Sequence, residues 1–293
     1  FYIRRVLRIW PLYFLILSLG FLVFPFIFYP EYFINPAESN LTLKLFLSVF
    51  FLPNFVLHYF GSYFATGVLW SVGVEEQFYL VWPWFNKKKR SSVSVVGIFL
   101  IYVAVKISLI AIAKTGYGTE VIEIGLKLLS HDVILVGCFF GYLLHKGKNL
   151  KIIYSRISVV LAIVILVALL FLKWLLKFND WGLLNNVFAF CYGILIVNIS
   201  TNRRSIIKLE NPILNYLGRI SYGIYMYHSI FIGLGVYLFG SQLSTGDFIG
   251  NVYLYAFSVA LTILVSAISY QFFEQPFIKM KEKFMVVKSS SKR

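Results

Sequence analysis

The chain has few acidic residues and few charges of any kind. Of its 293 residues only 12 are Asp or Glu, against 27 Lys or Arg, and all charged residues together make up 13% of the sequence. Soluble globular domains carry about 25% charged residues. Hydrophobic residues instead make up 59% of this chain, and its mean hydropathy is +0.80. This composition excludes a soluble globular protein and predicts an integral membrane protein.

Cysteine is nearly absent, and several common sequence patterns are missing. Cys138 and Cys191 lie in separate apolar runs without metal-ligand spacing, so we expect neither a disulfide nor a metal site. The sequence also has no internal repeat, no glycine-rich phosphate loop and no heptad run. It therefore gives no support to a solenoid, a P-loop protein or a coiled coil.

Apolar runs, most of them long enough to cross a bilayer, alternate with short polar connections. They predict an all-α fold, a polytopic transmembrane helical bundle of about eight spans plus one re-entrant or interfacial segment. We expect a single transmembrane domain over residues 1–287 and a disordered cytoplasmic tail over residues 288–293. The runs are Leu12–Tyr29, Leu41–Leu57, Tyr63–Phe85, Val93–Ala113, Val121–Leu144, Ile157–Leu176, Trp181–Ile199, Ile213–Phe239 and Phe248–Ile278.

The net charge of +15 is concentrated in short basic clusters between these runs. Such clusters mark cytoplasmic loops, so we expect contact with the lipid bilayer and none with nucleic acid. All of them share the cytoplasmic side only if the run Leu41–Leu57, which Pro53 and Asn54 interrupt, turns back without crossing. We therefore predict that this run is re-entrant and that the loop Gly116–Gly118 faces outward. The clusters are Arg4/Arg5/Arg8, Lys87–Arg90, Lys146–Arg156, Arg203–Lys208 and Lys279–Lys283.

Two adjacent carboxylates, Glu75 and Glu76, lie in the middle of an apolar run. An ionised side chain at bilayer depth costs roughly 2.5–3.5 kcal/mol, so such a residue is retained for function or is tightly paired. Ser71, Glu75 and Tyr79 recur at i, i+4 and i+8, and we expect this helix face, with Glu75, to point into the bundle. Alternatively, Glu75 forms a charge pair that holds two helices together and has only a structural role.

Ser221, Tyr225 and His228 repeat this pattern at i, i+4 and i+7 near the middle of the run Ile213–Phe239. An imidazole can take and return a proton near neutral pH, which makes His228 a candidate catalytic residue. A histidine hydrogen-bonded between helices would show the same pattern.

His131 and Asp132 are predicted near the middle of the run Val121–Leu144. Asp132 at that depth needs a cation or hydrogen-bond donors, and His131 could be such a donor. Gly137 and Gly141 follow, and small residues of this kind let helices approach closely.

Arg5 and Arg8 lie three residues apart, hence on one face of a helix that enters the membrane from the cytoplasm. Two adjacent guanidinium groups fit a phosphate or a carboxylate bidentately, which predicts an anionic cytosolic cosubstrate. A topology anchor is the alternative.

Four strings of residues, in order along the chain, resemble successive signatures of acyltransferase family 3: Phe1–Tyr13, Leu69–Pro83, Leu217–His228 and Phe273–Phe277. The segment His131–Gly137 also resembles the family's span with an acid a few residues before a glycine. The resemblance implies a membrane enzyme of about ten spans. Such an enzyme moves an acyl group, usually acetyl, from cytosolic acyl-CoA to a hydroxyl of a glycan or lipid-linked sugar.

The resemblance also implies roles for individual residues. Arg5 and Arg8 would bind acyl-CoA as a cosubstrate, with no permanently bound cofactor. Glu75, Asp132 and His228 are the catalytic candidates, and Ser71, Tyr79, Ser221 and Tyr225 the candidate substrate contacts. The family's first span carries an arginine and, after ten intervening residues, a histidine; the sequence has no counterpart before Phe1, and we expect the chain to be a fragment. The expected location is a bacterial inner or cytoplasmic membrane.

A transporter or flippase for a glycan lipid is the competing hypothesis, in which the same polar residues would line a pathway. It predicts inverted repeats and broken half-helices in matched positions, whereas the sequence has a single break at Pro53. A non-catalytic membrane scaffold would leave the buried Glu, Asp and His residues unexplained.

Overall fold

A computed structural model describes residues 1–28, 40–61, 66–86, 92–113, 131–147, 150–176, 184–240 and 248–284, with the single positions 115, 122, 125 and 126. Every regular element in these residues is a helix, which confirms the predicted all-α fold. The chain divides into two compact units. The first unit consists of Phe1–Val74 together with Pro212–Arg293, and the second consists of Glu75–Asn211. The single domain over residues 1–287 stays a prediction, and the predicted tail lies outside the described residues.

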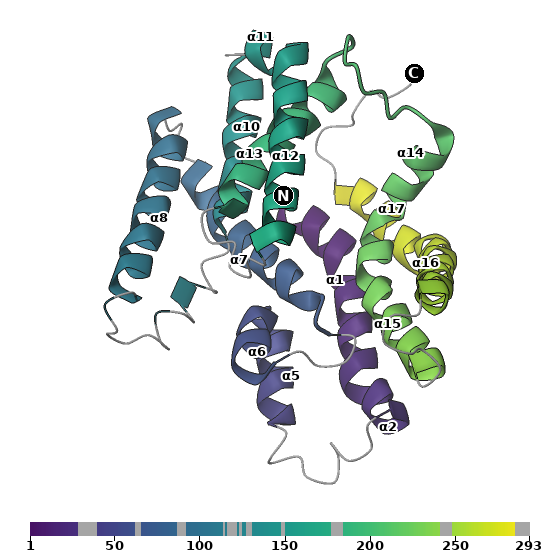
Figure 1. Ribbon diagram of the computed structural model, residues 1–293. Coiled ribbons are helices and arrows are strands. Elements are labelled where there is room, and N and C mark those ends of the chain that lie inside the picture. Colours follow the sequence, from purple (N-terminus) through teal and green to yellow (C-terminus); the bar gives the residue numbers. More distant parts are fainter. Residues whose placement is uncertain are drawn as a thin grey trace. The chain divides into compact units, whose positions relative to one another are not determined.

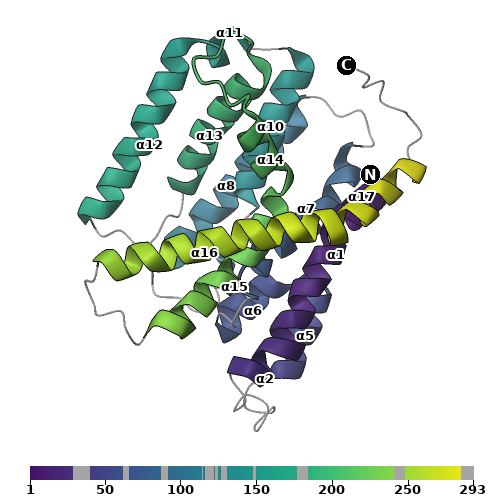
Figure 2. The same cartoon turned by 90° about the vertical axis from the view of Figure 1, so that its right-hand side faces the viewer.

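The first unit is built around α1 (Tyr2–Ser18), against which α15 (Ser221–Phe239) and α17 (Gln275–Met280) pack. α15 also packs along α16 (Phe248–Ser269), which continues through the π-helical turn η3 (Tyr270–Glu274) into α17 (Figure 1, Figure 2). Leu12, Tyr13 and Met226 are fully buried in this core. The other elements are η1 (Leu19–Val23), α2 (Phe24–Phe28), α5 (Leu41–Val49), α6 (Pro53–Phe60), the start of α7 (Leu69–Asn86), α14 (Pro212–Arg219) and η4 (Lys281–Phe284).

The second unit holds the rest of α7 together with α8 (Ser92–Ala113), α10 (Asp132–Lys146), α11 (Leu150–Ile153), α12 (Arg156–Leu176) and α13 (Leu184–Thr201). α13 packs between α10 and α12. Val136, Phe140 and Val197 are buried in one apolar cluster, and Ala162, Leu166 and Cys191 in another.

Within the described residues, five helices are long and apolar enough to cross a membrane: Tyr2–Val23, Arg156–Leu175, Leu184–Thr201, Ser221–Phe239 and Phe248–Met280. Two shorter apolar helices, Val96–Ile112 and Val133–Lys146, fall in other predicted spans. Apolar side chains along α12 are exposed, Trp174 at 74%, as expected of side chains that face lipid. The chain is a multi-pass membrane protein, and the count of eight spans stays a prediction.

The predicted re-entrant run is broken into two short helices. α5 ends at Val49 and α6 begins at Pro53, where a proline fits the first turn of a helix. At 1.5 Å per residue each helix is only about 12–14 Å long, less than half of a bilayer core. The break is confirmed, although the chain turns at residues 50–52, just before the predicted Pro53-Asn54.

Phe51 forms the turn between α5 and α6 in an unusual conformation. Its φ of +58° is left-handed, which is strained for a bulky residue. The ring of Phe51 lies 4.6 Å from that of Tyr13 and 5.1 Å from that of Trp10, both on α1. Tyr13 also donates a hydrogen bond to the carbonyl oxygen of Ser48 at 2.7 Å. These contacts of α1 hold the turn in place.

The start of α7 packs directly on this turn through Gly73. A Cβ at position 73 would lie 2.6 Å from Cδ of Pro53 and 3.1 Å from the carbonyl oxygen of Phe51. No side chain fits in that space, so the close approach of α7 to the turn depends on glycine.

Candidate functional site

The structure joins two of the predicted substrate contacts, Ser71 and Tyr225, although they are 154 residues apart in sequence. Both belong to the first unit. The hydroxyl of Tyr225 donates to the carbonyl oxygen of Val68 at 3.0 Å and is hydrogen-bonded to the hydroxyl of Ser71. The hydroxyl of Ser71 also lies within 3.4 Å of the same carbonyl oxygen, so the two hydroxyl groups share one acceptor, and either of them can donate in the bond between them. The pair therefore fixes α15 against the start of α7.

His228 lies one turn after Tyr225 on α15 and is half-buried. Its ring centroid is 5.6 Å from that of Tyr225. Its Nδ1 is 2.5 Å from the carbonyl oxygen of Tyr225, so Nδ1 carries the proton and donates it. Nε2 is then the acceptor nitrogen, which is the form of imidazole that a general base requires.

Ser221 does not join this group in the described structure. The helix predicted over Ile213–Phe239 is interrupted at Ile220, so Ser221 is the first residue of α15 and not near the middle of a helix. Its hydroxyl donates to the carbonyl oxygen of Gly218 at 2.9 Å. This local bond satisfies a carbonyl of the last turn of α14, and a substrate contact for Ser221 stays a prediction.

Glu75 and Tyr79 are also joined, in the second unit. The hydroxyl of Tyr79 donates to Oε2 of Glu75 at 3.3 Å, one turn apart on α7. Glu75 is exposed, whereas Glu76 is half-buried. The prediction that Glu75 points into the bundle stays a prediction, because Glu75 is the first residue of the second unit. Helix periodicity separates the two side chains by about 100°, but it does not determine which one faces neighbouring helices.

Asp132 is the first residue of α10, and His131 precedes it as the N-cap residue. The prediction that both lie in the middle of a helix is wrong, because the described helix starts at this point. The backbone N–H of His131 donates to the hydroxyl of Tyr102 on α8 at 3.2 Å. A catalytic role for Asp132 stays a prediction.

Arg5 and Arg8 lie on α1, as predicted. The guanidinium of Arg5 is half-buried, 5.5 Å from the centroid of the Phe1 ring, while Arg8 is exposed. A carboxylate without a predicted role, Glu274, lies in η3, which packs against α1. Glu274 is only 5% exposed and interacts with Ser269, whose hydroxyl accepts a hydrogen bond from Tyr227 at 3.1 Å. An acid in an apolar run, two residues before a proline, was the sequence feature that could have identified it.

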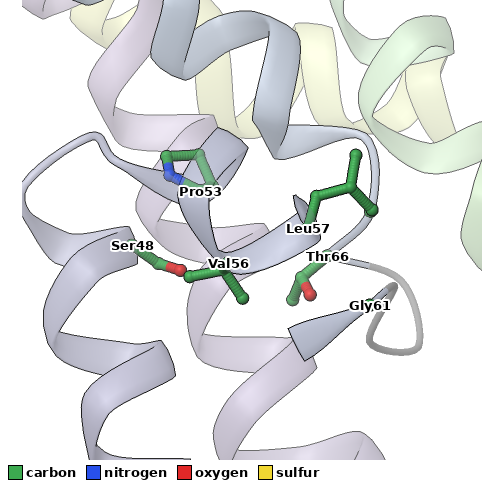
Figure 3. Close-up of a pocket in the computed structure, with 7 residues that line it drawn as sticks. Ser48, Pro53, Val56, Leu57, Gly61 and Thr66 are labelled. Carbon is green, nitrogen blue, oxygen red and sulfur yellow. The ribbon is translucent and has the colours of Figure 1, made fainter. Parts of the chain in front are cut away.

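A small cavity lies beside the turn at Phe51, in the first unit. It is partly open to solvent, and its empty space is about 210 Å³ when that open part is included. Figure 3 shows it between α5, α6 and the segment that leads to α7, with Ser48 and Thr66 presenting hydroxyl groups. It is lined by Ser48, Pro53, Val56, Leu57, Gly61, Thr66 and Gly67.

The predicted site residues fall in both units. Six of them, Arg5, Arg8, Ser71, Ser221, Tyr225 and His228, belong to the first unit, and Glu75, Tyr79 and Asp132 to the second. The described residues contain no group of three or more His, Cys, Asp or Glu side chains that could hold a metal ion. The first unit therefore contains a histidine one helical turn after Tyr225, whose hydroxyl is bonded to that of Ser71, and a pair of arginines on α1.

A family model described as an acyltransferase domain matches residues 1–271 of the chain. The chain belongs to this family. Three of the four strings that suggested it lie inside the matched residues, and Phe273–Phe277 follows just after them. The match confirms the resemblance to acyltransferase family 3.

Two relatives of this acyltransferase-domain protein carry names that state an activity. The peptidoglycan O-acetyltransferase OatA of Listeria monocytogenes is 25% identical over 310 residues, which cover 95% of this chain and 46% of the relative. The O-acetyltransferase OatA of Staphylococcus aureus is 25% identical over 308 residues, covering 95% and 47%. The chain thus spans about half the length of these relatives. No solved structure matches it.

Proposed function

We propose that this chain is the membrane domain of an O-acetyltransferase that moves an acetyl group from cytosolic acetyl-CoA to a hydroxyl of a cell-wall glycan. The observation that carries the proposal is its membership of the acyltransferase family over residues 1–271. The peptidoglycan relative suggests a peptidoglycan strand, or its lipid-linked precursor, as the acceptor. The group formed by Ser71, Tyr225 and His228 supplies chemistry that suits this reaction.

The donor would be bound from the cytoplasmic side through Arg5 and Arg8. Coenzyme A carries phosphate charges that cannot enter hydrocarbon, so they stay at the membrane surface. Guanidinium groups bind phosphate bidentately, and both arginines precede the apolar part of the first span. The thin pantetheine arm would then carry the thioester toward bilayer depth.

The residues of the site suit direct transfer of the acetyl group from CoA to the acceptor, without a covalent acyl-enzyme intermediate. Nε2 of His228 accepts the proton of the acceptor hydroxyl while the acceptor oxygen attacks the thioester carbonyl carbon. The C–S bond then breaks, and the proton passes from the imidazole to the sulfur of the departing CoA. The hydroxyls of Tyr225 and Ser71 would orient the sugar. Glu75 and Asp132 are the further catalytic candidates.

Radiolabelled acetyl-CoA tests the activity in membranes that contain the full-length protein. We expect alkali-labile label to appear in added cell-wall glycan with the wild type. The variant His228→Gln should lower this transfer by about 100-fold or more, because proton transfer is lost. Movement of glycan across the membrane without any label transfer would instead support the flippase hypothesis and contradict the proposal.

The donor site has its own test in Arg8→Ala. Loss of one guanidinium from a phosphate site should raise the apparent KM for acetyl-CoA about tenfold, with little change in kcat. Arg4→Ala is the matched control, because Arg4 is equally exposed on α1 but outside the Arg5/Arg8 pair. If the two variants had equal effects, Arg5 and Arg8 would serve only as a topology anchor.

A further inference from the structure

We propose that the cavity beside the turn at Phe51 receives the acyl group of the donor and, through its size, selects acetyl over longer acyl groups. This inference rests on the proposed function, since it gives a place to the group that is transferred there. It concerns residues of the first unit only.

The cavity is too small for most parts of the two substrates. Its empty space is about 210 Å³ even with the open part included. Pockets for drug-sized ligands have volumes of roughly 300–1,000 Å³. Neither the nucleotide of CoA nor a glycan chain can therefore enter. The acyl group has only a few non-hydrogen atoms, and it is the part of the substrates that fits.

The lining of the cavity suits an apolar group. Val56 and Leu57, consecutive on α6, present apolar side chains to it (Figure 3). Two lining residues, Ser48 and Thr66, carry hydroxyl groups. That of Ser48 already donates to the carbonyl oxygen of Lys44 at 2.8 Å, so its proton is not available to a ligand. A sugar would bring several hydroxyl groups that need partners, whereas a methyl group against Val56 and Leu57 needs none.

The cavity adjoins the candidate site through its own lining. Gly67 lines the cavity and is bonded covalently to Val68, whose carbonyl oxygen accepts the hydrogen bond of Tyr225 at 3.0 Å. The N–H of Leu69 donates to the carbonyl oxygen of Thr66 at 3.0 Å, so these residues form one tight turn. An acyl group in the cavity is thus next to the turn that holds Tyr225, which is proposed to orient the acceptor.

The walls of the cavity are held by neighbouring helices, so it does not widen easily for a longer chain. Tyr13 of α1 donates to the carbonyl oxygen of Ser48 at 2.7 Å. Gly73 of α7 packs so closely on Pro53 that a Cβ at position 73 would lie 2.6 Å from Cδ of the proline. Ser48 and Pro53 both line the cavity. A pocket of fixed size discriminates between groups that differ by one methylene by about 10–200-fold.

The test compares acetyl-CoA and propionyl-CoA as donors for the full-length protein in membranes. The wild type should use propionyl-CoA with a kcat/KM at least about tenfold lower than that for acetyl-CoA. Val56→Ala removes both methyl groups of a lining side chain, and should raise the ratio of the propionyl to the acetyl kcat/KM about tenfold. Val49→Ala is the matched control, because Val49 is an exposed valine on α5 outside the lining, and it should leave the ratio unchanged.

Leu57→Ala provides a second variant if Val56→Ala yields no folded protein by gel filtration, because Leu57 is only half-buried. An unchanged ratio in the folded variants, with acetyl transfer intact in the wild type, overturns this inference alone. Equal use of the two donors by the wild type does the same. A wild type that transfers no acetyl group removes the proposed function, and this inference with it.

Chemical protection tests the occupancy of the cavity without turnover. In a background with Cys138 and Cys191 replaced by serine, Leu57→Cys is treated with a small thiol reagent. Acetyl-CoA at about ten times its Kd should slow the reaction about tenfold, whereas free CoA, which lacks the acyl group, should leave the rate unchanged. Equal rates with acetyl-CoA and with free CoA would contradict the assignment of the cavity to the acyl group.

Discussion

In the first unit, the hydrogen bonds of Ser71, Tyr225 and His228 leave Nε2 of His228 available as a proton acceptor. Tyr225 and Ser71 bond to each other and Tyr225 bonds to the backbone at Val68, while Nδ1 of His228 donates to a carbonyl. Polar groups at bilayer depth need such partners, since hydrocarbon offers none. The bond from Nδ1 to the carbonyl oxygen of Tyr225 orients the imidazole with Nε2 as the acceptor.

The carboxylate of Glu75 can be tested independently of the histidine. Glu75→Gln should lower acetyl transfer by about 100-fold or more if a charge is needed for catalysis. It should leave the yield of folded protein unchanged, because Glu75 is exposed and exposed substitutions cost little stability. Glu210→Gln, which neutralises an exposed carboxylate outside the predicted site, is the matched control and should retain activity. A fully active Glu75→Gln would leave Glu75 with no catalytic role.

Residue patterns selected candidate side chains but did not predict which of them meet in the fold. Ser71 and Tyr225 were chosen from separate helix faces, and no spacing could show that they meet across 154 residues. The buried acid Glu274 was missed because it lies near the end of the last apolar run, where acids are ordinary. Its burial depends on α1 and α15, which are distant in sequence.

At the scale of the helices, glycine positions decide how closely elements pack. Gly137 and Gly141 were expected to allow close packing, yet a Cβ at either would meet nothing within 4 Å. The close approach in the second unit is at Gly193, where a Cβ would lie 2.2 Å from the ring of Phe140. Small residues in a sequence therefore indicate that close packing is allowed but do not locate it, because the facing helix is not known.

The packing of α7 on the turn between α5 and α6 gives a stability prediction. Gly73→Ala would place a methyl group 2.6 Å from the Pro53 ring, so we expect a loss of about 1–3 kcal/mol and a lower thermal midpoint. Gly137→Ala, in open space within a helix, should instead be neutral or stabilising by up to about 1 kcal/mol. Thermal unfolding of the two purified variants in detergent makes the comparison. Equal midpoints would show that α7 does not depend on this contact.

For the whole molecule, the sequence predicts which side of the membrane each loop occupies. Thr115 adjoins the loop predicted to face outward, and Arg203 lies in a predicted cytoplasmic cluster; both are exposed. In a background with Cys138 and Cys191 replaced by serine, a membrane-impermeant maleimide should label Thr115→Cys in intact cells. Arg203→Cys should react only after the cells are permeabilised. Labelling of Arg203→Cys in intact cells would contradict the predicted orientation.

Composition and charge clusters predicted the fold class and most helix positions, because hydrophobic length and the distribution of Lys and Arg are imposed by the bilayer itself. They could not predict the interruption at Ile220 or the π turn at Tyr270–Glu274, which depend on local backbone hydrogen bonding.

The strained turn at Phe51 has a consequence for all the chain that follows it. On the predicted re-entrant path, α5 and α6 return the polypeptide to the membrane surface from which it entered. The pair then adds no crossing, whereas one straight helix would add one. The number of crossings fixes the side of the membrane on which every later loop lies, so on this path the turn at Phe51 determines which end of α7 meets the cytosol.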